Sequence, residues 1–535
     1  MRSIKRHWPL IVAAIVLWST IAVLLLSSVT QNHRHLVYAL DDPYIHMAIA
    51  KNFSQHGVWG ATKYEFGSLS SSPLWTLILS SVYFLFGVDE VSPLVLNLVF
   101  ATLLLTLSYI LLRRSGLTPS ALFLVLLLML FATPLPAITF CGQEHILHAL
   151  LALLFVHLSA KTLSTERPGS CGFITLLILA PLVTMVRYEG LFLLFVVSVL
   201  FVMRRRVFHS LSLGAIGVLP LCAYGILSVL NGSYFLPNPV LLKGNLPDVS
   251  GLEETIKNLA HFVYQAVRAP HMLVLLSVVL ILFLHSYKRQ RQIWSYPTIM
   301  NTIFIVTTVL HMQFAGIGWF YRYEAYLLAL GFFVIVRVGS DYLPAKRSVA
   351  FDGILWPSHA AAALLVLLLV SPLAERAVVS LIRVPRATTN IYQQQYQMGL
   401  FLRDYYEGEA VAVNDIGAVN FVADIRCLDL WGLASIEVAR LRLRNGYTQE
   451  MMRELVREKG VKIAILYDSW YGEYGGVPSE WVRVGQWQIP NSVLVDSLVS
   501  FYAVDRLERD ELVENLRSCS SQLPKEIVQS GEYTR

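Results

Sequence analysis

The fold of this chain is decided by the stretch Tyr38-Ala39-Leu40-Asp41-Asp42-Pro43-Tyr44-Ile45-His46-Met47, which directly follows the first long apolar run, Trp8 to Ser28. Two adjacent carboxylates at the mouth of a membrane helix are unfavourable unless they are solvated, paired or used in chemistry. Pro43 suits the first position of a helix, and we predict that Asp42 is the N-cap. Apolar residues then recur at helical spacing, which predicts a helix lying along the membrane surface.

The composition is that of a polytopic membrane protein. The chain has 535 residues, 55% of them hydrophobic, with a mean hydropathy of +0.56. The first apolar run is too long for a signal peptide and lacks a small-residue cleavage site, so we expect an uncleaved anchor. The net charge of +6 does not indicate nucleic-acid binding, because the basic residues form short clusters between apolar runs. Such a distribution is typical of cytoplasmic loops.

The apolar runs and the basic clusters together predict the number of spans. The runs lie at about 8–28, 73–87, 92–112, 117–138, 143–160, 171–186, 190–203, 208–230, 270–287, 297–315, 324–339 and 351–371. The basic clusters are Arg2/Lys5/Arg6, Arg113/Arg114, Lys161/Arg167, Arg204/Arg205/Arg206, Lys288/Arg289/Arg291 and Lys346/Arg347. All clusters face the cytoplasm only if the run 73–87, about 22 Å long as a helix, dips into the membrane without crossing it. This leaves about eleven transmembrane helices, a cytoplasmic N-terminus and an extracytoplasmic C-terminal segment.

The chain divides into a membrane domain, 1–372, and a soluble α/β domain, 373–535. The membrane domain includes an outer loop, 29–91, that carries surface helices. In the soluble domain, Val411 to Asn414, Ile425 to Leu430 and Val461 to Tyr467 read as strands, and Gln449 to Lys459 reads as a helix.

The polar motifs of the membrane domain all fall on the outer side in this topology. They are Asp41-Asp42, Gly142-Gln143-Glu144-His145, Arg187-Tyr188-Glu189-Gly190, Pro237-Asn238-Pro239 with Lys243, and Gly318-Trp319-Phe320-Tyr321-Arg322-Tyr323-Glu324. Clusters from distant parts of the chain at the same span ends predict one shared cleft. A transporter more often places such residues near the midplane of the membrane.

This order of features resembles the GT-C membrane glycosyltransferases, which use sugars linked to a polyprenyl phosphate. In detail it is similar to the bacterial terminal arabinofuranosyltransferases of mycobacterial cell-wall assembly. The stretches that match are the first four of the motifs above, Ser71-Ser72-Pro73-Leu74-Trp75, Asn414-Asp415-Ile416-Gly417-Ala418 and Asp429-Leu430-Trp431-Gly432-Leu433. The chain departs from the family pattern at Pro239, where related sequences often carry Thr, and at Tyr188, where related sequences often carry the Pro of an Arg-Pro-Glu-Gly motif. The resemblance implies a protein with a GT-C fold in the inner membrane of a bacterium. It also implies a hexosyl- or pentosyltransferase whose sugar donor is linked to a lipid.

Sugar transfer from a lipid phosphate requires a base for the acceptor hydroxyl, cations for the departing phosphate and an apolar channel for the lipid. We predict that Asp41 and Asp42 are catalytic. Asp41 is the predicted base, because Asp42 is taken as the helix cap. The alternative is that both carboxylates only cap and solvate the start of the helix.

Four residues are predicted to bind the donor phosphate: Arg187, Lys243, Arg322 and His145. The alternative for Arg187 is an ion pair with Glu189 or Glu144, and for Arg322 an ion pair with Glu324. Lys243 is favoured because two prolines set an extended approach to it.

Six residues are predicted to bind the acceptor or the transferred sugar: Glu144, Glu189, Tyr44, Trp75, Asn238 and Asp415. The acceptor is a glycan, a lipid or a protein of the cell envelope. No metal site is predicted, although Asp41 and Asp42 leave room for a divalent cation. The predicted activity is therefore inverting glycosyl transfer on the outer membrane face, and the competing interpretation is a flippase or transporter of lipid-linked sugars.

Overall fold

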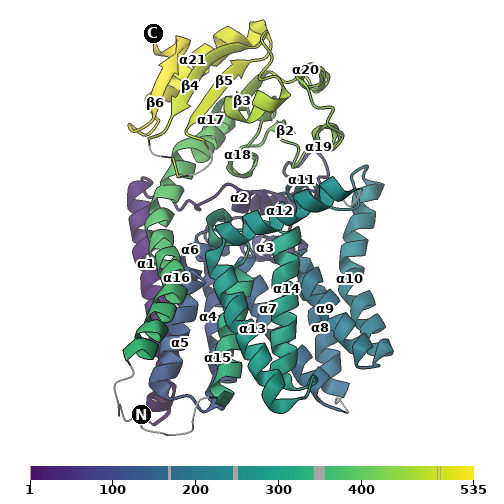
Figure 1. Ribbon diagram of the computed structural model, residues 1–535. Coiled ribbons are helices and arrows are strands. Elements are labelled where there is room, and N and C mark those ends of the chain that lie inside the picture. The colour runs from purple at the N-terminus through teal and green to yellow at the C-terminus, as the bar shows by residue number, and fades with distance from the viewer. Residues whose placement is uncertain (1, 167–169, 245–250, 343–355, 491, 494–495) are drawn as a thin grey trace.

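The computed structural model describes residues 2–166, 170–244, 251–342, 356–490, 492–493 and 496–535. A helical bundle forms one end of the molecule and a mixed α/β domain the other (Figure 1). The N-terminus lies at the far end of the bundle, away from the α/β domain. Arg167, Lys346, Arg347 and residues 351–355 of the last predicted span lie outside the described residues.

Each of the predicted spans coincides with a helix of the bundle. The helices are α1 (Arg2–Gln31), α4 (Ser92–Leu112), α5 (Pro119–Ala132), α7 (His145–Ser164), α8 (Ser170–Val186), α9 (Gly190–Met203), α10 (Val207–Leu230), α13 (Pro270–Gln290), α14 (Tyr296–Phe314), α15 (Ala325–Gly339) and α16 (Trp356–Ile391). Among the described residues, six helices are long and apolar enough to cross a membrane, and α5, α8 and α9 are shorter apolar helices. The predicted polytopic helical fold is confirmed.

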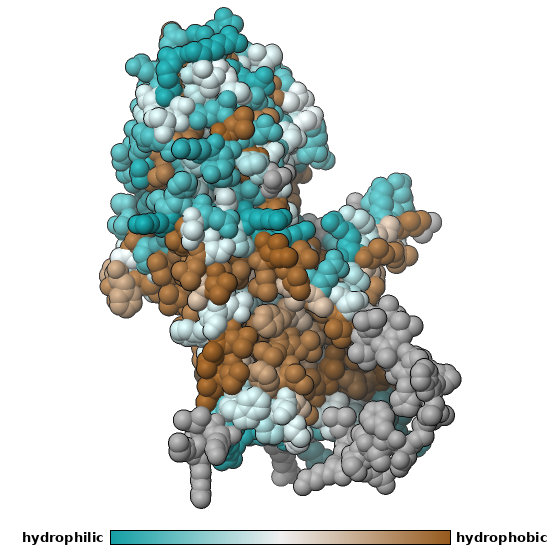
Figure 2. Space-filling model, turned by 90° about the vertical axis from the view of Figure 1, so that its left-hand side faces the viewer, coloured by the Kyte–Doolittle hydropathy of each residue, from teal (hydrophilic) through white to brown (hydrophobic). Residues whose placement is uncertain are grey.

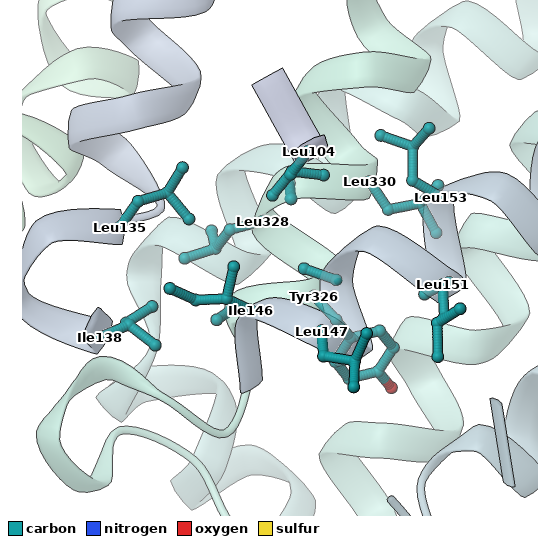
Figure 3. Packing of buried hydrophobic residues seen from close by; sticks show 14 of the residues in the cluster. Leu104, Leu135, Ile138, Ile146, Leu147, Leu151, Leu153, Tyr326, Leu328 and Leu330 are labelled. Carbon is teal, nitrogen blue, oxygen red and sulfur yellow. The ribbon is translucent and has the colours of Figure 1, made fainter. Parts of the chain in front are cut away.

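The core of the bundle is an apolar layer around α7. Leucines of α4 and α15 pack against α7 and the short helix α6 (Leu135–Thr139), as Figure 3 shows. The outside of the bundle is also apolar and forms a broad hydrophobic band below the hydrophilic α/β domain (Figure 2). A helix surface that is apolar toward both the core and the outside is typical of a membrane span.

Short helices cover the end of the bundle that faces the α/β domain. They are α2 (Asp42–His56), α3 (Pro73–Phe86), η2 (Trp319–Tyr321), α11 (Asn238–Lys243) and α12 (Leu252–Arg268). Helix α2 ends where Gly57 takes a left-handed conformation with φ of +71°. Helix α3 begins at Pro73, where the Ser72 hydroxyl accepts a hydrogen bond from the Trp75 amide at 3.3 Å.

The α/β domain continues directly from the last helix of the bundle. Helix α16 passes through a π-helical turn, Tyr392–Tyr396, into α17 (Gln397–Tyr405). Position 373 therefore lies inside α16, and the first strand begins at Ala410. The elements of the domain are β1 (Ala410–Val413), α18 (Gly417–Val422), β2 (Arg426–Asp429), α19 (Ile436–Leu443), α20 (Gln449–Glu458), β3 (Ile463–Leu466), β4 (Val482–Gln488), β5 (Leu498–Ala503), α21 (Arg509–Ser520) and β6 (Val528–Gly531).

The strands form one six-stranded sheet in the order β2-β1-β3-β5-β4-β6. The predicted strands correspond to β1, β2 and β3, which pair in parallel, and the predicted helix corresponds to α20. The antiparallel half of the sheet was not predicted. In parallel strands the carboxyl ends lie at one edge, where α/β proteins place their ligands. Asn414, Leu430 and Tyr467 follow those ends directly.

Candidate functional site

Two cavities meet at the boundary between the bundle and the α/β domain. The first, here called the bundle cavity, has a volume of about 330 Å³ and lies among the ends of α2, α9, α11 and α14. The second, the interface cavity, has a volume of about 540 Å³ and lies between α2, the π-helical turn and the carboxyl edge of the sheet. The residues that line both are Asp42, Ile45, Lys243, Tyr323 and Leu433.

Asp42 stands at this junction as the first residue of α2 and pairs with two cations. Its Oδ2 accepts a hydrogen bond from Nη2 of Arg322, and its Oδ1 lies 3.5 Å from Nζ of Lys243. Burial alone would raise the pKa of Asp42, but Lys243 and Arg322 outweigh burial and hold the pKa well below its usual range. Asp42 is therefore ionised at neutral pH and positions the two cations.

The N-cap prediction for Asp42 is wrong. The N-cap position of α2 is Asp41, and its side chain makes no capping bond to α2. Asp41 instead reaches across to the α/β domain. Its two oxygens accept hydrogen bonds from the amides of Gly417 and Ala418, at 2.7 and 2.8 Å, at the start of α18. The prediction that Asp41 is free because Asp42 caps the helix therefore does not hold. Asp41 connects the membrane domain to the α/β domain.

Gly417 allows this contact because it has no side chain. A Cβ at this position would lie 2.1 Å from the carbonyl oxygen and 2.6 Å from Oδ2 of Asp41. We expect Gly417→Ala to separate α18 from Asp41 and, if the chain has the predicted activity, to lower sugar transfer at least tenfold. Gly472→Ala in the same domain is the matched control, because a Cβ there meets nothing within 4 Å. Cleavage by a protease between the two parts should increase in Gly417→Ala alone. Equal activity of the two variants would contradict the prediction.

Arg322 is held at the junction between the bundle and the outer loop. Its Nη1 donates a hydrogen bond to Oε1 of Gln143, and its guanidinium lies 5.0 Å from the centre of the Tyr323 ring. The alternative ion pair of Arg322 with Glu324 is wrong. Glu324 pairs instead with Arg376 of α16 at 2.6 Å.

Arg187 forms the ion pairs that were considered as an alternative to phosphate binding. Its Nη1 lies 2.6 Å from Oε1 of Glu144, and its Nη2 lies 2.6 Å from Oε1 of Glu189. Burial alone would raise the pKa of Glu189, but Arg187 outweighs burial and lowers it to about 2. Tyr323 packs under the guanidinium at 5.5 Å. Two carboxylates thus neutralise Arg187 where it lines the bundle cavity.

Lys243 differs from both arginines in its accessibility. Its side chain is 45% exposed, whereas the Arg187 and Arg322 side chains are 10% and 2% exposed. The ion pair of Lys243 with Asp42 is also longer than the ion pairs of Arg187 and Arg322. Lys243 is therefore the cation with the most freedom to turn toward an incoming anion.

Asp415 lies in the interface cavity across from Asp41. Its Oδ2 accepts a hydrogen bond from Nε2 of Gln395 at 2.8 Å. Burial raises the pKa of Asp415 to about 6. Burial also raises the pKa of Asp41 well above its usual value, and the negative charge of Asp415 raises it further. The interface cavity thus holds two carboxyls whose proton affinity is higher than normal.

The other predicted site residues lie around the junction and do not line either cavity. Tyr44 is buried and its hydroxyl accepts a hydrogen bond from the Tyr38 amide, and Trp75 is buried against Phe100. Asn238 donates from Nδ2 to the carbonyl of Leu433 at 3.2 Å. Nε2 of His145 lies 3.7 Å from Oε1 of Glu144, and both residues are buried.

Apart from Asp415, sequence reasoning did not assign roles to the α/β residues of the interface cavity, nor to Gln143 or Tyr323. Gln143 and Tyr323 occur inside motifs that were recognised, so proximity to charged neighbours was the available signal. Of the described residues, no group of three or more His, Cys, Asp or Glu side chains is placed to hold a metal ion.

The chain resembles solved structures over nearly its whole length. It matches ArnT from Cupriavidus metallidurans bound to undecaprenyl phosphate, with 11% identity, a TM-score of 0.50 and coverage of 94% of this chain and 98% of that one. It matches the apo state of the same protein with 12% identity, a TM-score of 0.51 and coverage of 94% and 99%. Residues 389–502 match a domain family of unknown function, DUF8728. No curated protein matches the chain. The chain therefore has the fold of ArnT.

Proposed function

We propose that this protein is a membrane glycosyltransferase that moves a sugar from a polyprenyl-phosphate donor to an acceptor of the cell envelope. The observation that carries the proposal is the meeting of two chemically different cavities at Asp42 and Lys243. One cavity joins cations to an apolar end, and the other is lined by carboxylates and aromatic rings. The shared fold with ArnT, which was solved bound to undecaprenyl phosphate, supports this reading.

The bundle cavity suits an amphiphilic donor. Its polar end holds Arg187, Lys243 and Arg322, and its apolar wall includes Leu191, Phe192, Leu236, Val240 and Phe314. An anionic phosphate at the polar end would be stabilised by charge-assisted hydrogen bonds, and a prenyl chain would follow the apolar wall. We propose Lys243 as the principal phosphate ligand, with Arg322 positioned beside it by Asp42 and Gln143.

The reaction proposed is a single displacement at the anomeric carbon. An acceptor hydroxyl enters from the interface cavity and forms the new C–O bond. The bond between the anomeric carbon and the phosphate oxygen breaks on the opposite side, and the phosphate keeps the electron pair. Attack and departure from opposite sides give inversion. The cations stabilise the charge that develops on the phosphate.

We propose Asp41 as the general base that takes the proton from the acceptor hydroxyl. It lines the interface cavity, whereas Arg322 and Lys243 engage the neighbouring Asp42. Each carboxylate oxygen can accept more than one hydrogen bond, so the two amides of α18 leave lone pairs for a substrate. A raised pKa brings a carboxylate closer to the proton affinity that an efficient base needs near neutral pH.

We further propose that the α/β domain lies outside the inner membrane of a bacterium and that the N-terminus is cytoplasmic. The positive-inside rule supports this orientation. Arg6, Arg113 and Arg114 line one hollow together, and Arg204, Arg205 and Arg206 line another. The N-terminus lies at the end of the bundle away from the α/β domain (Figure 1).

The test is a transfer assay in vesicles that contain the full chain and radiolabelled polyprenyl-phosphate pentoses and hexoses, with cell-envelope glycans as acceptors. We expect one of the donors to yield a new glycosidic bond and free polyprenyl phosphate. Movement of label across the bilayer without a new bond would favour a flippase. The proposal would be overturned if the chain catalysed no sugar transfer and no donor hydrolysis with any of the donors.

A further inference from the structure

We propose that the interface cavity contains a binding subsite for an uncharged sugar unit of the acceptor, formed by Gln395, Asn414, Trp431 and Trp470. This inference rests on the proposed function and narrows its acceptor to a carbohydrate without phosphate at the reacting unit. All four residues line the cavity and come from the π-helical turn and from the loops that follow β1, β2 and β3. Its volume of about 540 Å³ lies within the usual range of ligand pockets, about 300–1,000 Å³.

Two buried amides leave hydrogen-bonding atoms without a partner. Gln395 is 4% exposed, and its Nε2 donates to Oδ2 of Asp415 and to the Tyr467 hydroxyl, both at 2.8 Å. Asn414 is 1% exposed, and its Oδ1 accepts a hydrogen bond from the Tyr467 amide at 3.2 Å. Within the described part of the chain, Oε1 of Gln395 and Nδ2 of Asn414 have no hydrogen-bond partner.

Such atoms indicate a ligand that the structure lacks. A buried polar atom without a partner costs about 1–3 kcal/mol, so most are satisfied in native proteins. One unpaired atom here is an acceptor and the other is a donor. A sugar hydroxyl both donates and accepts, so neighbouring hydroxyls on one ring can satisfy both amides.

The aromatic residues of the cavity supply the apolar contact that a sugar ring needs. Trp431 and Trp470 lie with their ring centres 4.8 Å apart at an angle of 60°. Both the backbone and the ring of Trp431 are fixed by contacts. Its amide donates to Oδ1 of Asp429 at 2.7 Å, and the Arg442 guanidinium lies 3.9 Å from its ring centre. A rigid indole loses little conformational entropy when a ligand packs against it.

The charges of the cavity decide between an uncharged and a phosphorylated ligand. Its lining includes Asp41, Asp42, Asp415 and Asp496. Of the described residues that line it, Lys243 is the one cation, and it already faces Asp42 at 3.5 Å. A phosphate in this cavity would meet an excess of negative charge at low dielectric. An uncharged polyhydroxylated ring meets no such repulsion.

The first experiment measures binding without turnover. The full chain in nanodiscs is titrated with short neutral oligosaccharides of pentoses and hexoses and with the same compounds carrying a terminal phosphate, and tryptophan fluorescence is recorded. We expect a neutral probe to quench fluorescence, and Trp470→Leu to weaken its binding about tenfold. Asn414→Ala should weaken binding by a similar factor. Tighter binding of the phosphorylated probes, or no binding by any probe, would overturn the inference.

Tyr64→Leu is the matched control, because Tyr64 is an exposed aromatic residue of the outer loop that lines neither cavity. This variant should bind the neutral probe as the wild-type chain does. Equal weakening in Tyr64→Leu and Trp470→Leu would also overturn the inference. Failure of the proposed function is recognised separately, since hydrolysis of the lipid-linked donor by the wild-type chain needs no acceptor. If the chain binds the neutral probe but neither transfers sugar nor hydrolyses the donor, the proposed glycosyltransferase activity is refuted. The proposed sugar-binding subsite is still supported in that case.

Discussion

Asp41→Asn is expected to lower kcat for sugar transfer by about 10²–10⁴-fold, the usual contribution of a positioned general base. The amide cannot accept the proton of the acceptor hydroxyl. It still has one oxygen to accept a hydrogen bond from Gly417 or Ala418, so the contact with α18 is weakened and not abolished. The measurement is single-turnover transfer with saturating donor and acceptor. Transfer at the wild-type rate would remove Asp41 from the mechanism.

The pH profile separates a base from a structural link between domains. The base acts when it is deprotonated, and the pKa of Asp41 is raised. Transfer by the wild-type chain should therefore fall as the pH drops through this raised pKa, well above the ordinary carboxyl value of about 4. Residual transfer by Asp41→Asn should lack this acid limb. The variant Gly417→Ala keeps the carboxylate of Asp41, so its pH profile should retain the acid limb even though its rate of transfer is low.

Arg322→Met is expected to lower the free energy of unfolding by about 3–5 kcal/mol and to abolish transfer. Without Arg322, Asp42 keeps only its longer and more exposed ion pair with Lys243, so its buried charge loses most of its compensation. Arg322 is almost fully buried and contacts both Asp42 and Gln143. Denaturant titration in detergent micelles measures the stability. Arg337→Met is the control, because Arg337 pairs at the surface with Asp341 at 3.0 Å, and such pairs contribute at most about 1 kcal/mol.

The double variant Asp42→Asn/Arg322→Met tests whether the loss of stability comes from the carboxylate of Asp42, which keeps only Lys243 as a partner. An amide at position 42 carries no charge, so the double variant should regain part of the stability lost in Arg322→Met. It should not regain transfer, because the phosphate has lost a cation and Lys243 has lost its partner. Additive loss of stability in the double variant would show that Asp42 and Arg322 do not interact.

Local patterns in the sequence were sufficient for the helices of the bundle and for the parallel strands of the sheet. Apolar runs of about 14 to 20 residues or more predict helices of the bundle, because lipid and core both require apolar side chains. Short apolar runs bounded by turn residues placed β1 and β3, which are buried along their whole length, and a similar run placed β2, of which only the second half is buried. In the antiparallel half, β4 and β6 were missed because they carry polar residues and weak alternation.

The polar motifs could be recognised from the sequence, but their partners could not. Asp42 and Arg322 are 280 residues apart, and Asp41 and Gly417 are 376 residues apart. The nearest carboxylate along the chain predicted the wrong partner for Arg322, because Glu324 turns toward Arg376 of a distant helix. The same proximity argument was right for Arg187 and Glu189.

By itself, the sequence determined the helical bundle, the parallel strands and the polar motifs that flank the site, since each depends on hydrophobicity and spacing within one segment. The tertiary structure alone decided which carboxylate pairs with which cation and that Asp41 reaches α18. It also decided that Gln395, Asn414 and two tryptophans share a cavity with Asp41. These outcomes depend on how distant helices and the α/β domain pack together. Packing sets distances between side chains that local spacing does not encode.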